Sequence, residues 1–307
     1  MFTEIACACA PGDAGRPNED LAVAGPSWVV VIDGATAPAG VDSGCAHDVA
    51  WLVARLGGAL AARLSADAPA PVPTPLPDLL SAAIADTAEA HGGGCDLGNP
   101  DSPSATVALV RAAAGRLDHL VLGDSPVLLG LAGGGVRVVA DDRLERLPGG
   151  RPYSLELVRR LRNAPGGFWV AAARPEAAAE AVHGSVDLRE VRAAGLCTDG
   201  VTRLVDWYGW TWDDLAAELE TRGPRAAVEA VRVLESARGP LRGKLHDDAT
   251  AVWARLPEAW PQVSGPARGS RQGGLDRRAR GDQQDRAGPA ADAHRGRISP
   301  SWPRRPP

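Results

Sequence analysis

The sequence predicts an α+β fold in which a β-sandwich is flanked by helical layers. Strand-like runs come first, two helical segments follow, and short apolar runs then lead to further helices and a closing strand. The run Trp28-Val29-Val30-Val31-Ile32 is apolar at every position, which is typical of a strand buried on both faces. A sandwich covered by helices would bury such a strand on both sides.

The N-terminal half is predicted to form three strands and then two helices. The strands are residues 2–10, 21–24 and 28–32. Residues 42–64 carry apolar side chains at three- and four-residue steps, as a core-facing helix requires, and Asp42 or Ser43 could cap this helix. A Pro-rich loop, 68–77, separates it from a second helix at 79–91, which His91-Gly92-Gly93-Gly94 ends.

Four short apolar runs come next, and the Gly-rich or Asp-containing turns between them indicate antiparallel pairing. The runs are residues 105–111, 117–122, 127–131 and 136–140. On this interpretation Gly123-Asp124-Ser125 is a hairpin turn. The remaining predicted elements are a helix at 153–162, a strand at 191–197, helices at 212–219 and 225–237, and a strand at 248–256.

Composition predicts a soluble globular protein, with 45% hydrophobic and 23% charged residues in 307. We expect neither a membrane span nor a signal peptide, and hence a cytoplasmic protein. Residues 261–307 contain ten Arg and four Asp, a balance of +6, so the first 260 residues carry −11 of the total of −5. This acidic body argues against nucleic-acid binding. Residues 1–256 are predicted to form the catalytic domain and 257–307 a disordered basic tail.

The cysteines and histidines give no clear sign of a zinc site. The five cysteines form no C-x-x-C pair, and we expect small buried residues in a reducing cytosol. Cys7 and Cys9 should share one face of a strand and occupy core positions. His47, near Cys45, could be a ligand or an acid, although a structural or solvent-facing role is favoured. His91 shows no zinc-site spacing.

Five short acidic motifs occur at or beside the ends of the apolar runs. They are Asn18-Glu19-Asp20, Asp33-Gly34, Gly123-Asp124-Ser125, Thr198-Asp199-Gly200 and Asp247-Asp248. A turn explains each motif taken alone. Taken together, acids at interior strand ends are costly unless a cation neutralises them. Two divalent ions about 4 Å apart would do so and would activate a water, with Asp33 the best candidate to bridge them.

The ordered set NED, DG, GDS, TDG and DD resembles the type 2C metal-dependent protein phosphatases. The resemblance covers about residues 3–256 and extends beyond the acids. Further similar stretches are 104–108, 120–129, 197–202 and 247–252. The resemblance implies a β-sandwich between helical layers (α-β-β-α), with a binuclear Mn²⁺ or Mg²⁺ centre at one end and a weaker site for a third ion.

The resemblance also assigns roles to individual residues. Asp33 would bridge the ions, the Gly34 carbonyl would bind one of them, and Asp199 and Asp247 would bind the other. Glu19 and Asp20 would act mostly through ion-bound waters, and Asp124 would help hold the third ion together with Asp199. The activated water would attack phosphorus in line, without a covalent phosphoenzyme. The predicted catalytic residues are Asp33, Asp199, Asp247 and Arg16.

Three positions depart from the family pattern. Gly15 stands where the family often has a phosphate-clamping Arg, and Arg16, one residue away, is the candidate replacement. Ala35 stands where some relatives have a His that protonates the leaving group, and the turn after Asp33-Gly34 is Ala-Thr-Ala-Pro-Ala-Gly.

The resulting hypothesis is a Ser/Thr phosphatase that acts on phosphorylated proteins. Two alternatives stay open: a catalytically weak relative that binds phosphorylated partners or regulates a pathway, and a phosphatase of small molecules. The sequence does not specify an oligomeric state.

Overall fold

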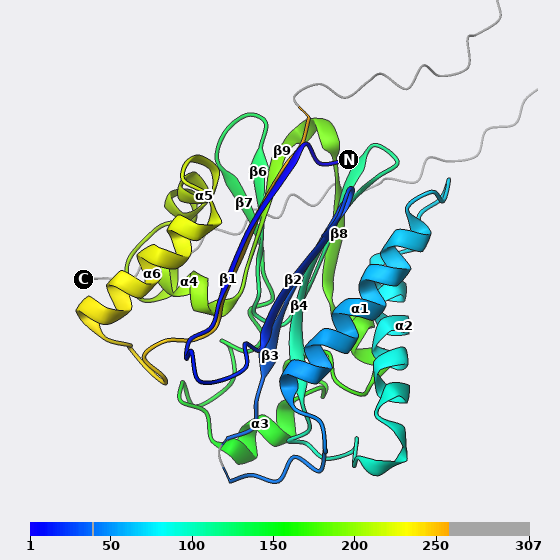
Figure 1. Cartoon of the computed structure of the whole chain (residues 1–307), viewed down its shortest axis with the longest axis vertical. Helices are drawn as coiled ribbons and strands as arrows, with labels where there is room; N and C mark the ends of the chain where they lie inside the picture. Colours follow the sequence, from blue (N-terminus) through cyan, green and yellow to red (C-terminus); the bar gives the residue numbers. More distant parts are fainter. Residues whose placement is uncertain (39, 258–307) are drawn as a thin grey trace, which may run out of the picture. The chain divides into compact units, whose positions relative to one another are not determined.

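Two five-stranded antiparallel sheets form the centre of the computed structural model, which describes residues 1–38 and 40–257 (Figure 1). The first sheet has the strand order β1-β10-β9-β6-β7 and the second the order β2-β3-β4-β5-β8. The strands of the first sheet are β1 (Glu4–Ala10), β10 (Ala249–Arg255), β9 (Val191–Cys197), β6 (Val127–Leu131) and β7 (Val136–Val139). Those of the second are β2 (Asp20–Gly25), β3 (Trp28–Ala35), β4 (Ser104–Ala113), β5 (Arg116–Leu122) and β8 (Val182–Asp187).

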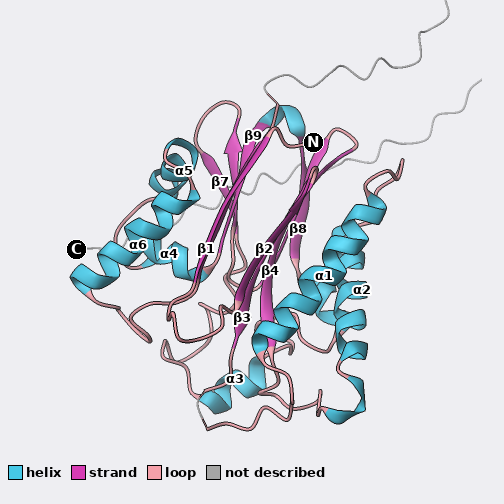
Figure 2. Ribbon diagram, viewed as in Figure 1, coloured by secondary structure: helices cyan, strands magenta, loops and turns pink. Residues whose placement is uncertain are grey.

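Helices cover the outer face of each sheet (Figure 2). Two helices, α1 (Val49–Asp67) and α2 (Leu76–Ala90), share a core with the second sheet. Three helices, α4 (Asp199–Asp206), α5 (Trp212–Thr221) and α6 (Pro224–Arg238), share a core with the first sheet. A short helix, α3 (Leu155–Leu161), lies in the segment between β7 and β8. The predicted α+β sandwich between helical layers is confirmed.

Strand β3 shows why the central runs are apolar at every position. Val29 and Val31 point into the core between the two sheets. Val30 and Ile32 point the other way, into the core shared with α1 and α2. All four side chains are fully buried. Each face of the strand therefore needs apolar residues, because a β-strand alternates its side chains between its two faces.

Helix α1 begins later than predicted, at Val49 rather than Asp42. The Asp48 carboxylate accepts a hydrogen bond from the Trp51 backbone N–H at 2.8 Å and caps the helix. Asp42 instead accepts from the Gly44 N–H at 2.9 Å and stabilises a turn. By length and composition α1 could cross a membrane, contrary to the sequence-based expectation. Its apolar stripe, which includes Leu52, is nevertheless buried against the second sheet.

The segment Gly123-Asp124-Ser125 is not a hairpin turn, which corrects the predicted antiparallel series. Strand β5 pairs with β4 and β8, whereas β6 pairs with β7 and β9. The segment therefore carries the chain from one sheet to the other. Strand β8 and helix α4 were not predicted, and α4 starts at Asp199, where the sequence indicated only a turn.

The predicted basic tail, 257–307, lies outside the described residues from residue 258 on, and stays a prediction. Cys7 and Cys9 are exposed, so the expectation that they are core residues is wrong. They share a face of β1, as the strand period requires, but that face is the accessible one.

Adjacent glycines in α1 provide a test of the packing between the helix and the second sheet. A Cβ at Gly58 would meet no atom within 4 Å, whereas a Cβ at Gly57 would lie 2.2 Å from Leu21 Cδ2. We expect Gly58→Ala to raise the free energy of unfolding by about 0.5–1 kcal/mol, because alanine favours the helix. Gly57→Ala should give no net gain, because Leu21 must move. Urea denaturation of both variants measures the difference, and equal gains would contradict this packing.

Candidate metal centre

The cross-strand register of the second sheet places two of the predicted acids side by side. Asp20, the first residue of β2, is the direct antiparallel partner of Asp33 in β3. Asp33 is in turn paired with Thr106 in β4. The Thr106 and Ser125 hydroxyls are 2.6 Å apart, which anchors the crossover segment beside this strand end. Acids from the NED, DG and GDS motifs thus gather at one end of the sandwich.

A threonine hydroxyl joins the two sheets at this end. Thr198, which follows β9, donates a hydrogen bond to Asp20 Oδ2 at 2.9 Å. The same hydroxyl accepts from the Thr250 backbone N–H of β10 at 2.9 Å. Thr198 is fully buried. The TDG motif of the first sheet is therefore fixed directly against the NED motif of the second.

The second acid of the DD motif organises the loop before β2. Asp248 accepts hydrogen bonds from the backbone N–H groups of Gly12 and Glu19, both at 2.7 Å. Gly200 packs against the same segment, because a Cβ there would lie 1.9 Å from the Asp248 carbonyl oxygen. A side chain at position 200 would separate Asp199 from the DD motif, which explains the glycine.

Gly34 is held by the same loop. Its N–H donates to the Glu19 carbonyl at 3.0 Å, and a Cβ would lie 2.3 Å from Val49 Cγ1 of α1. The Glu19 carboxylate accepts from the Thr36 hydroxyl at 2.6 Å. Glu19 and Gly34 are therefore neighbours at the strand end, as their predicted roles require.

Electrostatics show that the acids interact with one another. Burial raises the pKa of Asp33 well above its usual value, and Asp199, Asp20, Asp124 and Asp247 raise it further. Burial, with Asp124 and Asp247, raises the pKa of Asp199 to about 8. Asp20 reaches a pKa of about 7, mainly through burial. Burial also raises the pKa of Asp124, which Arg151 opposes from 3.7 Å.

These residues fit a hard divalent cation. Asp20 Oδ1 is buried without any hydrogen-bond partner in the described part of the chain, although its sister oxygen is bonded to Thr198. A buried carboxylate oxygen without a hydrogen-bond partner, next to other acids, is costly in an apolar setting and favourable beside an ion. The donors are carboxylates and a backbone carbonyl, which Mg²⁺ and Mn²⁺ prefer.

Arg203, on α4, is a site residue that the sequence interpretation missed. Its guanidinium donates to Asp247 Oδ2 at 2.7 Å and to the buried Glu235 at 2.6 Å, and it lies 4.3 Å from the centre of the Trp207 ring. Lys244 Nζ also contacts Asp247, at 2.5 Å. Asp247 is therefore neutralised by two cations of the chain itself. The sequence feature that could have identified Arg203 is its position four residues after Asp199. That spacing puts two residues on one face only in a helix, and no helix was predicted there.

The structure does not bring Arg16 to the acids through any described contact. Its side chain is exposed, and its backbone N–H donates to the Asp13 carbonyl at 3.1 Å. Its role as the phosphate clamp stays a prediction. Arg151 also faces the cluster, at 3.7 Å from the Asp124 carboxylate.

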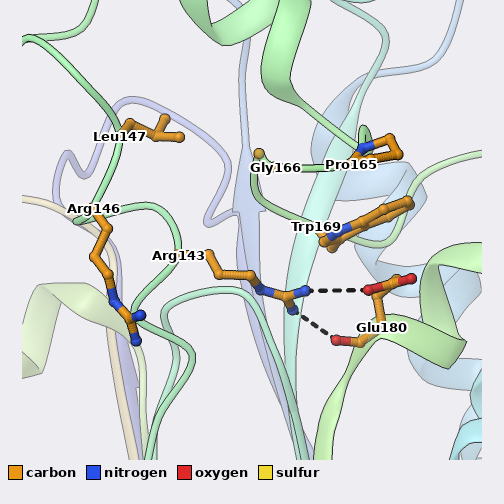
Figure 3. Close-up of a pocket in the computed structure, with 8 residues that line it drawn as sticks. Arg143, Arg146, Leu147, Pro165, Gly166, Trp169 and Glu180 are labelled. Atoms are coloured by element: carbon orange, nitrogen blue, oxygen red, sulfur yellow. Dashed lines mark hydrogen bonds and ion pairs between the residues drawn. The ribbon is translucent and has the colours of Figure 1, made fainter.

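A pocket of about 490 Å³ lies between the segment that carries Arg143 and the segment that carries Trp169 (Figure 3). None of the predicted metal ligands lines it. Arg143 lines this pocket. Its guanidinium lies 3.5 Å from the Glu180 carboxylate and donates a hydrogen bond to the Glu180 backbone carbonyl at 2.7 Å. The same guanidinium binds Asp141, whose carboxylate accepts from the Gly123 N–H at 3.4 Å. The pocket is thus connected to the segment that carries Asp124.

The fold and the acid cluster together define a class, a metal-dependent phosphoesterase built as an α-β-β-α sandwich. The family model for protein phosphatase 2C matches residues 13–234. The chain therefore belongs to the protein phosphatase 2C family. No curated protein sequence matches it.

Solved structures share the fold. PppA, a key regulatory component of T6SS in Pseudomonas aeruginosa, is 20% identical over 83% of this chain and 98% of its own, with a TM-score of 0.54. The Mycobacterium tuberculosis serine/threonine phosphatase PstP is 20% identical over 83% and 99%, with a TM-score of 0.53. The catalytic domain of PstP in complex with two manganese ions is 21% identical over 82% and 97%, with a TM-score of 0.50.

The raised pKa values predict that the metal-free protein loses stability as pH rises. Folded Asp199 and Asp20 keep protons up to about pH 8 and about pH 7, whereas the ordinary Asp pKa is 3.8. The unfolded chain then binds fewer protons, so the free energy of unfolding falls with pH. Buried His119, whose pKa is lowered to about 4, has the opposite effect below its ordinary value of 6.5.

Urea denaturation in chelator at pH 6.5 and pH 8 covers the range in which folded Asp20 and Asp199 lose their protons. We expect lower stability at pH 8, a smaller fall in Asp199→Asn, and an unchanged fall in Glu229→Gln, which removes an exposed carboxylate of α6. Added Mn²⁺ should restore stability at pH 8. A wild-type stability that is flat or rises over this range would show that the acids do not share a buried site.

Proposed function

We propose that the chain hydrolyses phosphoserine and phosphothreonine in phosphorylated proteins, with Mn²⁺ or Mg²⁺ at the acid cluster. The observation that carries this proposal is that four acids from distant segments act on Asp33, and that one oxygen of its neighbour Asp20 has no hydrogen-bond partner among the described residues. Family membership supports the reaction class. The two manganese ions bound to PstP support the proposed cofactor.

The proposed ligands are those that the family pattern assigns. Asp33 and the Gly34 carbonyl would hold one ion, and Asp33, Asp199 and Asp247 the other. Glu19 and Asp20 would act through waters, and Asp124 would help hold a third ion. Bound ions would supply an activated water and stabilise charge on the phosphoryl oxygens.

The other residues of the site position these ligands. The Thr198 hydroxyl fixes the orientation of Asp20. The Asp248 carboxylate fixes the loop that carries Glu19. Arg203 and Lys244 hold Asp247 close to the cluster and must share it with an ion. Arg16 and Arg151 are the candidate groups to bind substrate phosphate.

The proposed compartment is the cytoplasm, which the five free cysteines support. The acidic body supports a protein partner rather than a nucleic acid, and we propose no membrane partner.

A catalytically weak relative that binds phosphorylated partners is the second candidate. Two observations favour it. Asp247 is paired with Arg203 and Lys244, and Ala35 stands where some relatives have a His that protonates the leaving group. A small-molecule phosphatase would use the same centre. Mn²⁺-dependent hydrolysis of p-nitrophenyl phosphate separates the enzymes from the binding module, and phosphopeptides compared with phosphometabolites separate the two enzymes.

Substitution of the bridging acid should have the largest effect on turnover. We expect Asp33→Asn to lower kcat by about 10²-fold or more, because the ions contribute several kcal/mol of transition-state stabilisation. Asp124→Asn should be milder and partly rescued by high Mn²⁺. Glu229→Gln is the charge-matched control and should keep wild-type kinetics. Full activity in Asp33→Asn would contradict the centre.

The two candidate phosphate clamps can be distinguished by their kinetic signatures. If Arg16 binds the phosphate, Arg16→Ala should raise KM for a phosphopeptide more than it lowers kcat. If Arg151 does so, Arg151→Ala should show this pattern and Arg16→Ala should match wild type. Unchanged kinetics in Arg16→Ala would overturn the prediction made from the sequence.

A further inference from the structure

Two cysteines and two histidines converge at one end of the α1–α2 layer and differ in chemistry from the acid motifs. Cys45 and His47 precede α1, His91 is the C-cap residue of α2, and Cys95 follows a short 3₁₀ turn. One ligand atom from each of the four residues lies within 4.8 Å of all the others. Figure 1 shows the start of α1 and the end of α2 at the same end of the layer.

The distances between these atoms fit a tetrahedral zinc ion. Cys45 Sγ lies 3.4 Å from Cys95 Sγ, 3.4 Å from His91 Nδ1 and 3.8 Å from His47 Nδ1. Cys95 Sγ lies 3.4 Å from His47 Nδ1. Zn–S and Zn–N bonds of about 2.3 and 2.0 Å at tetrahedral angles separate two sulfurs by about 3.8 Å and a sulfur from a nitrogen by about 3.5 Å. The observed separations agree to within a few tenths of an ångström.

The sulfur pair does not form a disulfide. A disulfide needs an S–S distance of about 2.05 Å, and both cysteines are free. The remaining structural explanation is plain packing of thiols and rings. Simple packing would not need the potential ligand atoms to point toward one point in space. Here each sulfur lies close to a histidine Nδ1 and to the other sulfur, as ligands of one ion do.

The local sequence builds this arrangement from two short pairs, Cys-x-His and His-x₃-Cys. An antiparallel helix pair brings the start of α1 beside the end of α2. Gly92, at φ +66°, opens the turn that returns Cys95 toward His91. The two loops are also joined by Asp96 N–H to the Gly44 carbonyl, 2.8 Å, and by Asn99 Nδ2 to the Asp42 carbonyl, 3.1 Å.

The surroundings orient the four groups. The His47 backbone N–H lies 3.4 Å from Cys45 Sγ, the kind of contact that supports a thiolate ligand. Trp51 stacks on the His47 ring at 3.9 Å and packs edge-on against His91 at 4.6 Å. His91 is buried and the other three residues are partly exposed, so an ion can enter.

We propose that Cys45, His47, His91 and Cys95 bind a structural zinc ion. Four protein ligands fill a tetrahedral shell and leave no open position for substrate, which is typical of a structural site. Thiolate and imidazole donors select zinc over the Mn²⁺ or Mg²⁺ that carboxylates prefer. The ion would fix the loop that follows Asp33-Gly34 to the end of α2.

Metal analysis of the full chain tests the proposal. The protein is purified from zinc-supplemented culture, dialysed and measured by mass spectrometry for metals. We expect about one zinc per chain in wild type and a loss of about tenfold or more in Cys45→Ser and Cys95→Ser. Cys7→Ser, an exposed thiol on β1, is the matched control and should keep zinc. Asp33→Asn should keep it as well, which separates this site from the acid cluster.

Cobalt substitution gives a readout that does not depend on activity or on the stability of a variant. Co²⁺ added to zinc-depleted wild type and to Asp33→Asn should give a thiolate-to-cobalt charge-transfer band, which competing zinc removes. The proposal is overturned if zinc-supplemented wild type holds no zinc, or if the cysteine variants keep it. It is equally overturned if Asp33→Asn loses the zinc, or if Cys45 and Cys95 are found as a disulfide in the purified protein.

Discussion

Mutual repulsion among carboxylates at one end of the sandwich is the constraint to which the rest of the site responds. Asp20 and Asp33 are cross-strand partners, and Asp199 and Asp247 act on them from the other sheet. Like charges in a buried setting raise the pKa of each group and weaken the folded state. Neutral hydrogen-bond donors nevertheless hold two of the acids in place. The Thr198 hydroxyl binds Asp20, and two backbone N–H groups bind Asp248. Holding like charges close together in this way is favourable when a bound cation offsets their repulsion.

Asp247 shows how the chain limits that cost where it can. Arg203 pairs with it while remaining bonded to the buried Glu235, which Arg232 and His246 also contact. Removing one partner of such a network leaves a buried charge uncompensated. An ion that binds Asp247 therefore competes with a cation that has other partners and can stay in place. The Asp247 carboxylate could therefore leave Arg203 for a metal ion while Arg203 stays bonded to Glu235 and α4 keeps its position.

Patterns read along the chain predicted the layers, and they placed acids at strand ends, because both features depend on local sequence. The β3 run is apolar on both faces and Asp33 falls at its end, so one segment indicated both the strand and the candidate ligand. The crossover at Gly123-Asp124-Ser125 was not visible, because apolar runs joined by a short turn look alike whether they pair or change sheets. The start of α1 was misplaced for a related reason: Asp42 and Asp48 are both good caps, and only the fold selects between them.

The Cys/His cluster was missed because its two halves lie 46 residues apart, and only the pairing of α1 with α2 brings them together. Taken singly, Cys45 with His47 and His91 with Cys95 are ordinary residues of loops at helix ends. Judged together, they give a second ligand set in which sulfur and nitrogen replace oxygen. Soft donors on the helix layer and hard donors at the sheet ends would favour different ions at the two proposed sites. Strand β3 carries Asp33 and Gly34 near its end, and the connection from β3 to α1 carries Cys45 and His47 near its own end. Fixing Cys45 and His47 would tether the connection that leaves the β3 end, so ion binding at the helix layer would support the strand end on which the proposed metal centre depends.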